Sequence, residues 1–558
     1  MTYLPFEFQK TNENKPLRIA VTDDTPNGSG KEIRDNLWLA AITAAMLRNN
    51  ALHGVKISVE FQGDINGPSA GAVSCLAILS AIDGLSLPDD FAMTGTIFPD
   101  GTIGDVGGIV EKIIAAAKAG KKRIFVPGYR RMIEDASGKL IDIINLAEKL
   151  NIAIFPVGNI EEAFAFIYNK SFPEKKYINE KSVTAISRDA EELFKKEYTR
   201  YLAMLTDILK KIPEESVNSV CTMFNINFGF EKLFREGKFT AAIFRIIEHY
   251  AMFTTALKTL QVHKKWQVPL FGNAKKVLAK IHKRNFEFAT NAVYRLLDEH
   301  ENKLQKTLST SPDRHPSPIS AQLEDPENVS DLLAAVHALN SHYESIKNLH
   351  LSKEQFENEK LLELFLLQSG ELAAFSQKDK VKLHDEIAGT LPHKQPNPAA
   401  SKVENLFKTA QVATKNAAFS EFPNDEYRED IEINEYLAAT ISDFALKYHN
   451  DIASNPTDYH TQVSLKLQVS AFVKSTVLLV RKYRDISTDF AQYLIRNARE
   501  SALKNLQECF VSSIPSLEPI RAFQIAESIE NSQDNLEEIL EDYWYSALYA
   551  KALLISFK

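Results

Sequence analysis

Gly67-Pro68-Ser69-Ala70-Gly71 is the stretch that decides how this chain folds. It runs directly into residues 72–82, which are apolar on nearly every face and therefore predict a buried helix. The small residues beside Ser69 leave the backbone bare, so that a peptide carbonyl can approach closely. Ser69 then lies at a helix N-terminus, where unpaired N–H groups can stabilise an oxyanion. The alternative for this pentapeptide is an N-cap serine whose glycines serve a turn.

A lysine about forty residues further on lies in a second predicted helix, residues 109–120. The larger apolar residues of that helix form one stripe at helical spacing: Ile109, Val110, Ile113, Ile114 and Ala117. Lys112 lies off the stripe, and the residues that follow it at helical spacing are Ala115, Ala116 and Ala119. Desolvation on an alanine-lined face and the positive end of the helix dipole both favour a neutral amine, which could act as a general base. The alternative is a surface lysine whose alanines reflect helix propensity.

These two segments belong to a longer series of motifs within residues 17–168. The series runs, in chain order, Thr25-Pro26-Asn27-Gly28-Ser29-Gly30-Lys31, Gly67-Pro68-Ser69-Ala70-Gly71, Ala92-Met93-Thr94-Gly95, Gly101-Thr102-Ile103-Gly104-Asp105-Val106-Gly107-Gly108, Glu111-Lys112, Ala115-Ala116, Ala119-Gly120, Ile124-Phe125-Val126-Pro127 and residues 157–164. With several linked motifs at these spacings, the segment resembles the proteolytic domain of Lon-type proteases, the Ser/Lys-dyad family.

The resemblance implies a serine endopeptidase that acts on protein or peptide substrates. By position in the motifs, Ser69 corresponds to the nucleophile and Lys112 to the general base. Thr94 corresponds to a threonine near the dyad and could form a hydrogen bond with the lysine amine. The residues that would support the site from around the serine are Asn66, Gly67, Pro68, Ala70 and Gly71.

The chain departs from the family pattern just before the serine. Typical bacterial members have aspartate where this chain has Asn66, and a glutamate where it has Gln62. The loop of residues 62–65 is also shorter than theirs. These changes lie in the expected substrate cleft and leave the dyad in place, so they affect the expected substrate geometry and level of activity.

No complete nucleotide-binding loop accompanies these motifs. Residues 28–32, Gly-Ser-Gly-Lys-Glu, lack both the first glycine and the final hydroxyl residue of a phosphate-binding loop. About sixteen residues precede the first strand that the sequence predicts, too few for an ATP-driven unfoldase. We therefore expect a peptidase that works without ATP on unfolded or accessible chains, or with a separate unfoldase or regulatory partner.

Glycine content divides the chain into two parts. Sixteen of the 21 glycines precede residue 170, where β-rich runs at residues 17–22, 56–61 and 123–126 alternate with helical patterns. The remainder is predicted to be helical, with candidate helices at residues 188–211, 241–262, 274–308, 332–349, 431–448, 461–484 and 536–554. We predict an α+β protein: a Lon-like α/β domain at residues 1–175, a helical domain at 180–308, a linker at 309–328 and a helical region at 329–558 with a seam at 391–400.

Composition narrows the class of protein. A net charge of −8 argues against a general nucleic-acid binder. Three widely spaced cysteines disfavour a disulfide scaffold. The sequence shows neither a signal peptide nor an apolar run long enough to cross a membrane, so we expect a cytoplasmic protein without membrane contact. No motif indicates a metal or a cofactor.

The role of the helical region is left open by the sequence. It could recognise substrate, gate access or set assembly. The resemblance implies a homo-oligomer, since Lon-like domains assemble as rings, although a bulky helical appendage could prevent this. The alternative to an active peptidase is an inactive or regulated Lon-like scaffold that acts through protein–protein interaction by its helical region.

Overall fold

The computed structural model describes several separate stretches of the chain. They are residues 5–170 without 12–14, 24–29, 62–67 and 129, and 180–257 with short gaps, followed by 399–418, 458–483 and 487–557 without 515 and 530–534. Asn66, Gly67, the predicted linker at residues 309–328 and most of the predicted seam at 391–400 lie outside the described residues.

The first sheet has the order β1-β3-β2. Its strands are β1 (Phe6–Lys10), β2 (Arg18–Asp23) and β3 (Val55–Phe61), and α1 (Gly30–Leu47) leads from β2 to β3. Strand β2 is parallel to β3, whereas β1 pairs with β3 in antiparallel register. The expectation that the first strand begins near residue 17 is wrong. In β1, Phe6 and Phe8 alternate with polar residues and pack on the core, a period-two pattern that marks a half-buried strand.

The second sheet is parallel and has the order β10-β7-β4. It consists of β4 (Phe91–Met93), β7 (Arg123–Pro127) and β10 (Ala153–Val157). In β7, Ile124 and Val126 face a small core with α3 (Ile109–Lys118) and α4 (Ile143–Leu150). The intervening Phe125 joins the main core and stacks on Phe155, as the alternation of side chains along a strand requires.

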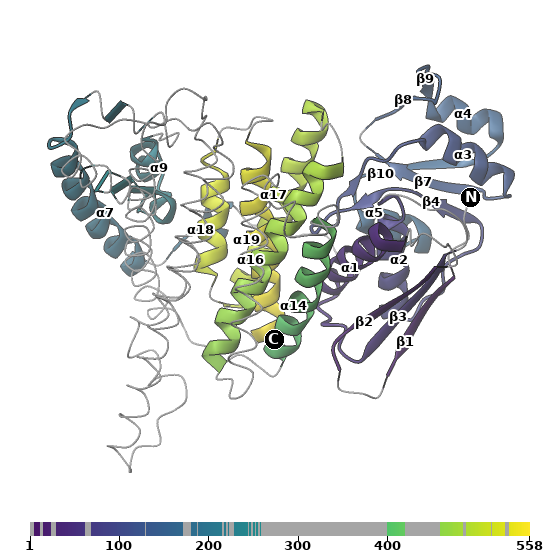
Figure 1. The fold of residues 1–558 in the computed structure, drawn as a ribbon, viewed down its shortest axis with the longest axis horizontal. Helices are drawn as coiled ribbons and strands as arrows, with labels where there is room; N and C mark the ends of the chain where they lie inside the picture. The colour runs from purple at the N-terminus through teal and green to yellow at the C-terminus, as the bar shows by residue number, and fades with distance from the viewer. Residues whose placement is uncertain are drawn as a thin grey trace, which may run out of the picture.

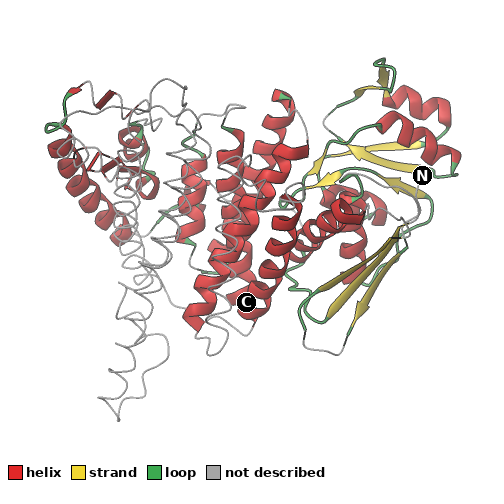
Figure 2. Cartoon of the chain, in the orientation of Figure 1, coloured by secondary structure: helices red, strands yellow, loops and turns green. Residues whose placement is uncertain are grey.

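Two short hairpins complete the α/β part. One is formed by β5 (Thr96–Ile97) and β6 (Ile103–Gly104), the other by β8 (Met132–Glu134) and β9 (Leu140–Asp142). Helices α2 (Gly71–Ile82) and α5 (Ile160–Tyr168) pack together and contribute to the main core. The rest of the described chain is helical, so the predicted α+β class is confirmed (Figure 2).

A bundle of C-terminal helices packs beside the α/β part (Figure 1). Its members are α14 (Ala399–Ala418), α16 (Asp458–Tyr483), α17 (Thr488–Val511), α18 (Leu517–Ala526) and α19 (Leu536–Phe557). Helix α19 is buried along most of its length, and α1 packs against α14 and α19. The α/β part and the bundle therefore share one apolar core. Helices α6 (Glu180–Val183), α7 (Arg188–Leu209) and α9 (Phe230–Arg235) precede the bundle in the chain, and α7 and α9 lie on its far side in the view of Figure 1.

Candidate active site

Ser69 lies in the turn that leads into α2. Ala70, not Ser69, is the N-cap residue of α2, and no side chain caps the helix. The structure therefore does not show the capping role that was the alternative for Ser69. The side chain is half-buried, as a nucleophile that must meet substrate requires.

Backbone hydrogen bonds join the turn that contains Ser69 to Gly95, the residue after Thr94. The N–H of Gly95 donates to the carbonyl oxygen of Ser69 (3.0 Å), and the N–H of Ala72 donates to the carbonyl oxygen of Gly95 (3.0 Å). Two backbone hydrogen bonds thus hold the start of α2 against the end of β4. Sequence reasoning did not single out Gly95. A side chain there would meet Ile103 Cγ2 at 2.5 Å, and the glycine after Thr94 in its motif was the available signal.

Thr94 carries a buried hydroxyl group that has no hydrogen-bond partner within the described part of the structure. Its backbone N–H donates to the carbonyl oxygen of Phe125 in β7 (3.1 Å), which fixes it at the carboxyl end of β4. Because buried polar groups are nearly always paired, an unused hydroxyl beside the serine turn is available to another group at the site.

Gly71 also has a packing role that the sequence did not indicate. A Cβ atom at Gly71 would lie 3.0 Å from both the backbone nitrogen and Cγ2 of Ile97 in β5. The glycine is buried, and its missing side chain makes room for β5. Pro68 and Ala70 flank Ser69 and are half-buried like it.

Lys112 lies in the first turn of α3, and its N–H donates to the carbonyl oxygen of Gly108 (3.0 Å). Gly108 is the N-cap residue and has φ 64°, a left-handed conformation that favours glycine. The Lys112 side chain is half-buried. Ala116, one turn later on the same face, is buried in the core that α3 forms with β7, so this face of the helix is turned partly toward protein.

Chain topology brings these segments to one edge of the second sheet. Strands β4 and β7 are parallel neighbours, and α3 lies between them in the chain and packs on β7. A crossover helix runs opposite to its strands, so its first turn lies near their carboxyl ends. Lys112 in that first turn and Thr94 at the end of β4 are therefore on the same edge, where Gly95 also holds the Ser69 turn. Ligands of open α/β sheets bind at this edge.

The start of α2 offers backbone donors. Within the described part of the chain, the N–H groups of Ser69 and Ala70 donate no hydrogen bond. Both lie at the positive end of the α2 dipole, which favours a developing negative charge. This arrangement could hold the oxyanion of a tetrahedral intermediate.

Cys75 lies on α2 one to two turns behind Ser69 and is fully buried. Burial raises the pKa of its thiol well above the usual range, which disfavours a thiolate nucleophile. Among the described residues, no group of three or more His, Cys, Asp or Glu side chains could hold a metal ion. None of the helices within those residues has the length and apolar character needed to cross a bilayer.

Comparison with known proteins finds similarity in this part of the chain. Residues 45–165 match the family described as the Lon protease (S16) C-terminal proteolytic domain. This part of the chain is similar to the proteolytic domain of Lon-type proteases. The resemblance that the motifs predicted is thereby confirmed, and it covers the stretch that holds Ser69, Thr94 and Lys112.

Three relatives illustrate the extent of the similarity. The archaeal Lon protease of Methanocaldococcus jannaschii is 34% identical over 121 residues, 21% of this chain and 17% of that protein. The Lon protease of Metamycoplasma arthritidis is 37% identical over 103 residues, 18% of this chain and 12% of the relative. That of Buchnera aphidicola subsp. Schizaphis graminum is 31% identical over 150 residues, 25% of this chain and 18% of the relative. The matched segment thus spans less than a fifth of each relative.

Proposed function

We propose that this chain is a serine endopeptidase of the Lon type that uses Ser69 and Lys112 as its catalytic dyad. Neutral Lys112 Nζ takes the hydroxyl proton as Ser69 Oγ attacks the carbonyl carbon of a peptide bond. Lys112 then protonates the leaving amine, and a water molecule that gives a proton to Lys112 hydrolyses the acyl-enzyme. The observation that supports the proposal is the pair of backbone hydrogen bonds between Gly95 and the start of α2, which place the Ser69 turn at the sheet edge where α3 begins.

Other groups at that edge have roles in the same mechanism. The N–H groups of Ser69 and Ala70 bind the oxyanion as it forms. The unused hydroxyl of Thr94 accepts a hydrogen bond from an N–H of the Lys112 amine and thereby orients the amine lone pair toward Ser69. Asn66 and Gly67 precede Pro68 in the segment that would border the bound peptide.

The substrates that we propose are unfolded or accessible polypeptides. These 558 residues contain no complete phosphate-binding loop, and the chemistry of the dyad consumes no nucleotide, so we infer that the hydrolysis step itself needs no ATP. The helical region recognises substrate or controls access to the site. We further propose a cytoplasmic protein that does not bind nucleic acid, and a homo-oligomer by analogy with Lon rings.

Digestion of casein, with and without ATP, tests the proposal. Ser69→Ala should lower kcat/KM by roughly a thousand-fold or more because the nucleophile is lost. Lys112→Arg should lower it by roughly a hundred- to ten-thousand-fold, because a guanidinium stays protonated and cannot act as the base. Ser74→Ala in α2 and Lys118→Arg at the exposed end of α3 are matched controls and should retain activity.

Two outcomes would contradict the proposal. Equal digestion by wild type and Ser69→Ala would exclude Ser69 as the nucleophile. If wild type digests nothing, alone or with an added unfoldase, the alternative of an inactive or regulated scaffold is favoured.

A further inference from the structure

The β5–β6 hairpin, residues 96–104, connects the two halves of the proposed site. It begins directly after Gly95, whose backbone is bonded to the Ser69 turn, and its second strand leads through four residues to α3 and Lys112. Each strand has only two residues, which pair as Thr96↔Gly104 and Ile97↔Ile103. A shift of this short hairpin would therefore move both halves of the site.

Helix α19 holds the tip of the hairpin. Trp544 is fully buried, and its indole stacks on Phe98 with 5.7 Å between ring centroids and 22° between ring planes. The indole Nε1–H donates to Asp100 Oδ2 (3.1 Å), while Asp100 Oδ1 accepts from the backbone N–H of Thr102 (2.9 Å). One carboxyl oxygen of Asp100 thus accepts a hydrogen bond from within the hairpin, and the other accepts one from the bundle.

Helix α17 holds the second strand of the hairpin through a carbonyl group. The hydroxyl of Tyr493 donates to the carbonyl oxygen of Gly158 (2.6 Å), and the N–H of Ile103 donates to that same oxygen (3.0 Å). A Cβ atom at Gly158 would lie 2.9 Å from the Tyr493 hydroxyl oxygen, so glycine permits this approach. Phe490 of α17 also packs near Phe98, with 6.4 Å between ring centroids.

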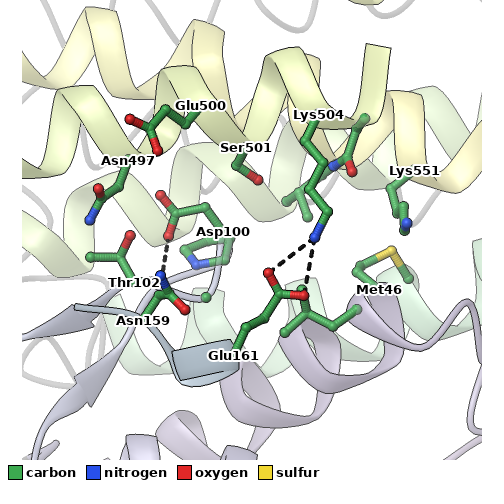
Figure 3. A pocket seen from close by; sticks show the side chains of 15 residues that line it. Met46, Asp100, Thr102, Asn159, Glu161, Asn497, Glu500, Ser501, Lys504 and Lys551 are labelled. Atoms are coloured by element: carbon green, nitrogen blue, oxygen red, sulfur yellow. Dashed lines mark hydrogen bonds and ion pairs between the residues drawn. The ribbon is translucent and has the colours of Figure 1, made fainter. Parts of the chain in front are cut away.

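A groove borders this contact (Figure 3). Its volume is about 690 Å³ including the open mouth, and it is lined on one side by Asp100 and Thr102 and on the other by side chains of α17 and α19. Lys504 of α17 crosses it to Glu161 of α5 (3.0 Å). Solvent space flanks the tip on this side only. On the other side the hairpin is buried, the hydroxyl of Thr43 in α1 donates to the carbonyl oxygen of Phe98 (3.2 Å), and the N–H of Ile160 donates to that of Gly101 (2.9 Å). On the side that faces the bundle, Trp544 and Tyr493 supply the hydrogen bonds that complete this set of contacts.

We propose that Trp544 and Tyr493 are positioning residues of the peptidase. Through Asp100 and Gly158 they hold the 96–104 hairpin, and thereby keep the Ser69 and Lys112 segments in the relative position that catalysis requires. This inference rests on the proposed function. It makes the C-terminal bundle a structural part of the peptidase, in addition to any role in substrate recognition. A displacement on the order of 1 Å at a catalytic group can cost about a hundred-fold in rate, so contacts this close to both segments are sufficient to matter.

The test uses the full chain and two measurements. Hydrogen exchange of peptides that cover residues 94–112 reports the hairpin directly, because the N–H groups of Phe98 and Ile103 are hydrogen-bonded there. Casein digestion, with Ser69→Ala as the blank, reports kcat and KM. The variants are Trp544→Phe, which keeps a stacking ring but loses the donor, Tyr493→Phe and Asp100→Asn. Tyr545→Phe is the matched control, since its buried hydroxyl on the same helix has no hydrogen-bond partner within the described part of the structure.

Loss of one buried hydrogen bond should speed exchange in residues 94–112 roughly ten-fold in Trp544→Phe and Tyr493→Phe. In the same variants kcat should fall about ten- to a hundred-fold with KM unchanged, since neither side chain lies at the proposed substrate site. Asp100→Asn should have a similar effect, because an amide has one acceptor oxygen for two donors. That effect should shrink in the Trp544→Phe background, where one of the donors is absent. Tyr545→Phe should change neither quantity.

The two proposals fail in different ways. Unchanged exchange in Trp544→Phe and Tyr493→Phe would show that the bundle does not hold the hairpin, whatever the activity. Faster exchange with wild-type kcat would show that the hairpin does not position the dyad. If wild type is no more active than Ser69→Ala, the peptidase proposal fails and the positioning role falls with it, while exchange still decides whether α17 and α19 hold the hairpin.

Discussion

Phe407 of α14 offers a test of whether the α/β part and the bundle fold as one unit. Its side chain is fully buried and packs edge-on against Phe472 of α16, with 5.7 Å between ring centroids. It lies in the same core as Leu37 of α1. Phe407→Ala should lower the free energy of unfolding by about 3–5 kcal/mol, since a buried aromatic is replaced by a cavity. That is a large fraction of the stability of an ordinary domain.

Native-state hydrogen exchange at increasing urea concentrations measures this loss helix by helix. Because α1 packs directly on α14, peptides from α1 and from α16 should lose protection by the same free energy. Phe510→Ala is the matched control: this side chain on α17 is 51% exposed, so its removal should change stability by about 0.5 kcal/mol or less. The reasoning is refuted if α16 loses protection while α1 keeps its own, because the two parts would then have independent cores.

Three further predictions concern the α/β part. Gly104→Ala should lower the free energy of unfolding by about 1–3 kcal/mol in a urea titration, because the new methyl group collides with the Thr96 hydroxyl. The Cys75 thiol should react with iodoacetamide only as fast as the protein unfolds, and labelling within minutes of native protein would contradict its burial. The hydrogen bond from Arg123 lowers the pKa of the Asp90 carboxyl below its value in the unfolded chain. The ion pair therefore stabilises the fold above about pH 4, and this stabilisation is lost as pH falls through the folded pKa. Asp90→Asn should cost about 1 kcal/mol or less at pH 7 and still less at pH 3, as urea midpoints at the two pH values would show.

Much of the local structure could be predicted from the sequence because it is encoded in short-range patterns. The apolar run at residues 72–82 and the stripe at 109–120 correspond to α2 and α3 within two residues. The predicted helix at 536–554 corresponds to α19. Among the described residues, every strand lies before residue 158, as the uneven distribution of glycine indicated.

The site could be predicted only as separate pieces. Motif spacing predicts Ser69, Thr94 and Lys112 as site residues, and Gly95 is the glycine after Thr94 in its motif. Which segments the backbone of Gly95 joins cannot be predicted from the local sequence. The contact between Asp100 and Trp544 joins residues 444 positions apart, and neither residue is marked by periodicity or composition. Such contacts follow from how whole elements pack, and a pattern read over one or two turns of helix contains no record of that packing.

Burial along α19 argues against regarding the helical region as a detachable module. From Tyr543 to Ser556 every residue of α19 is buried. The helix is enclosed by α14, α16, α17 and α18, and Trp544 contacts the hairpin. Deleting it would expose the apolar surfaces of its neighbours and remove Trp544 from Asp100 at once, so a loss of peptidase activity on truncation would not reveal which effect was responsible. A substitution such as Trp544→Phe separates the two better, because α19 stays in place and the indole N–H bond to Asp100 is lost together with only part of one ring.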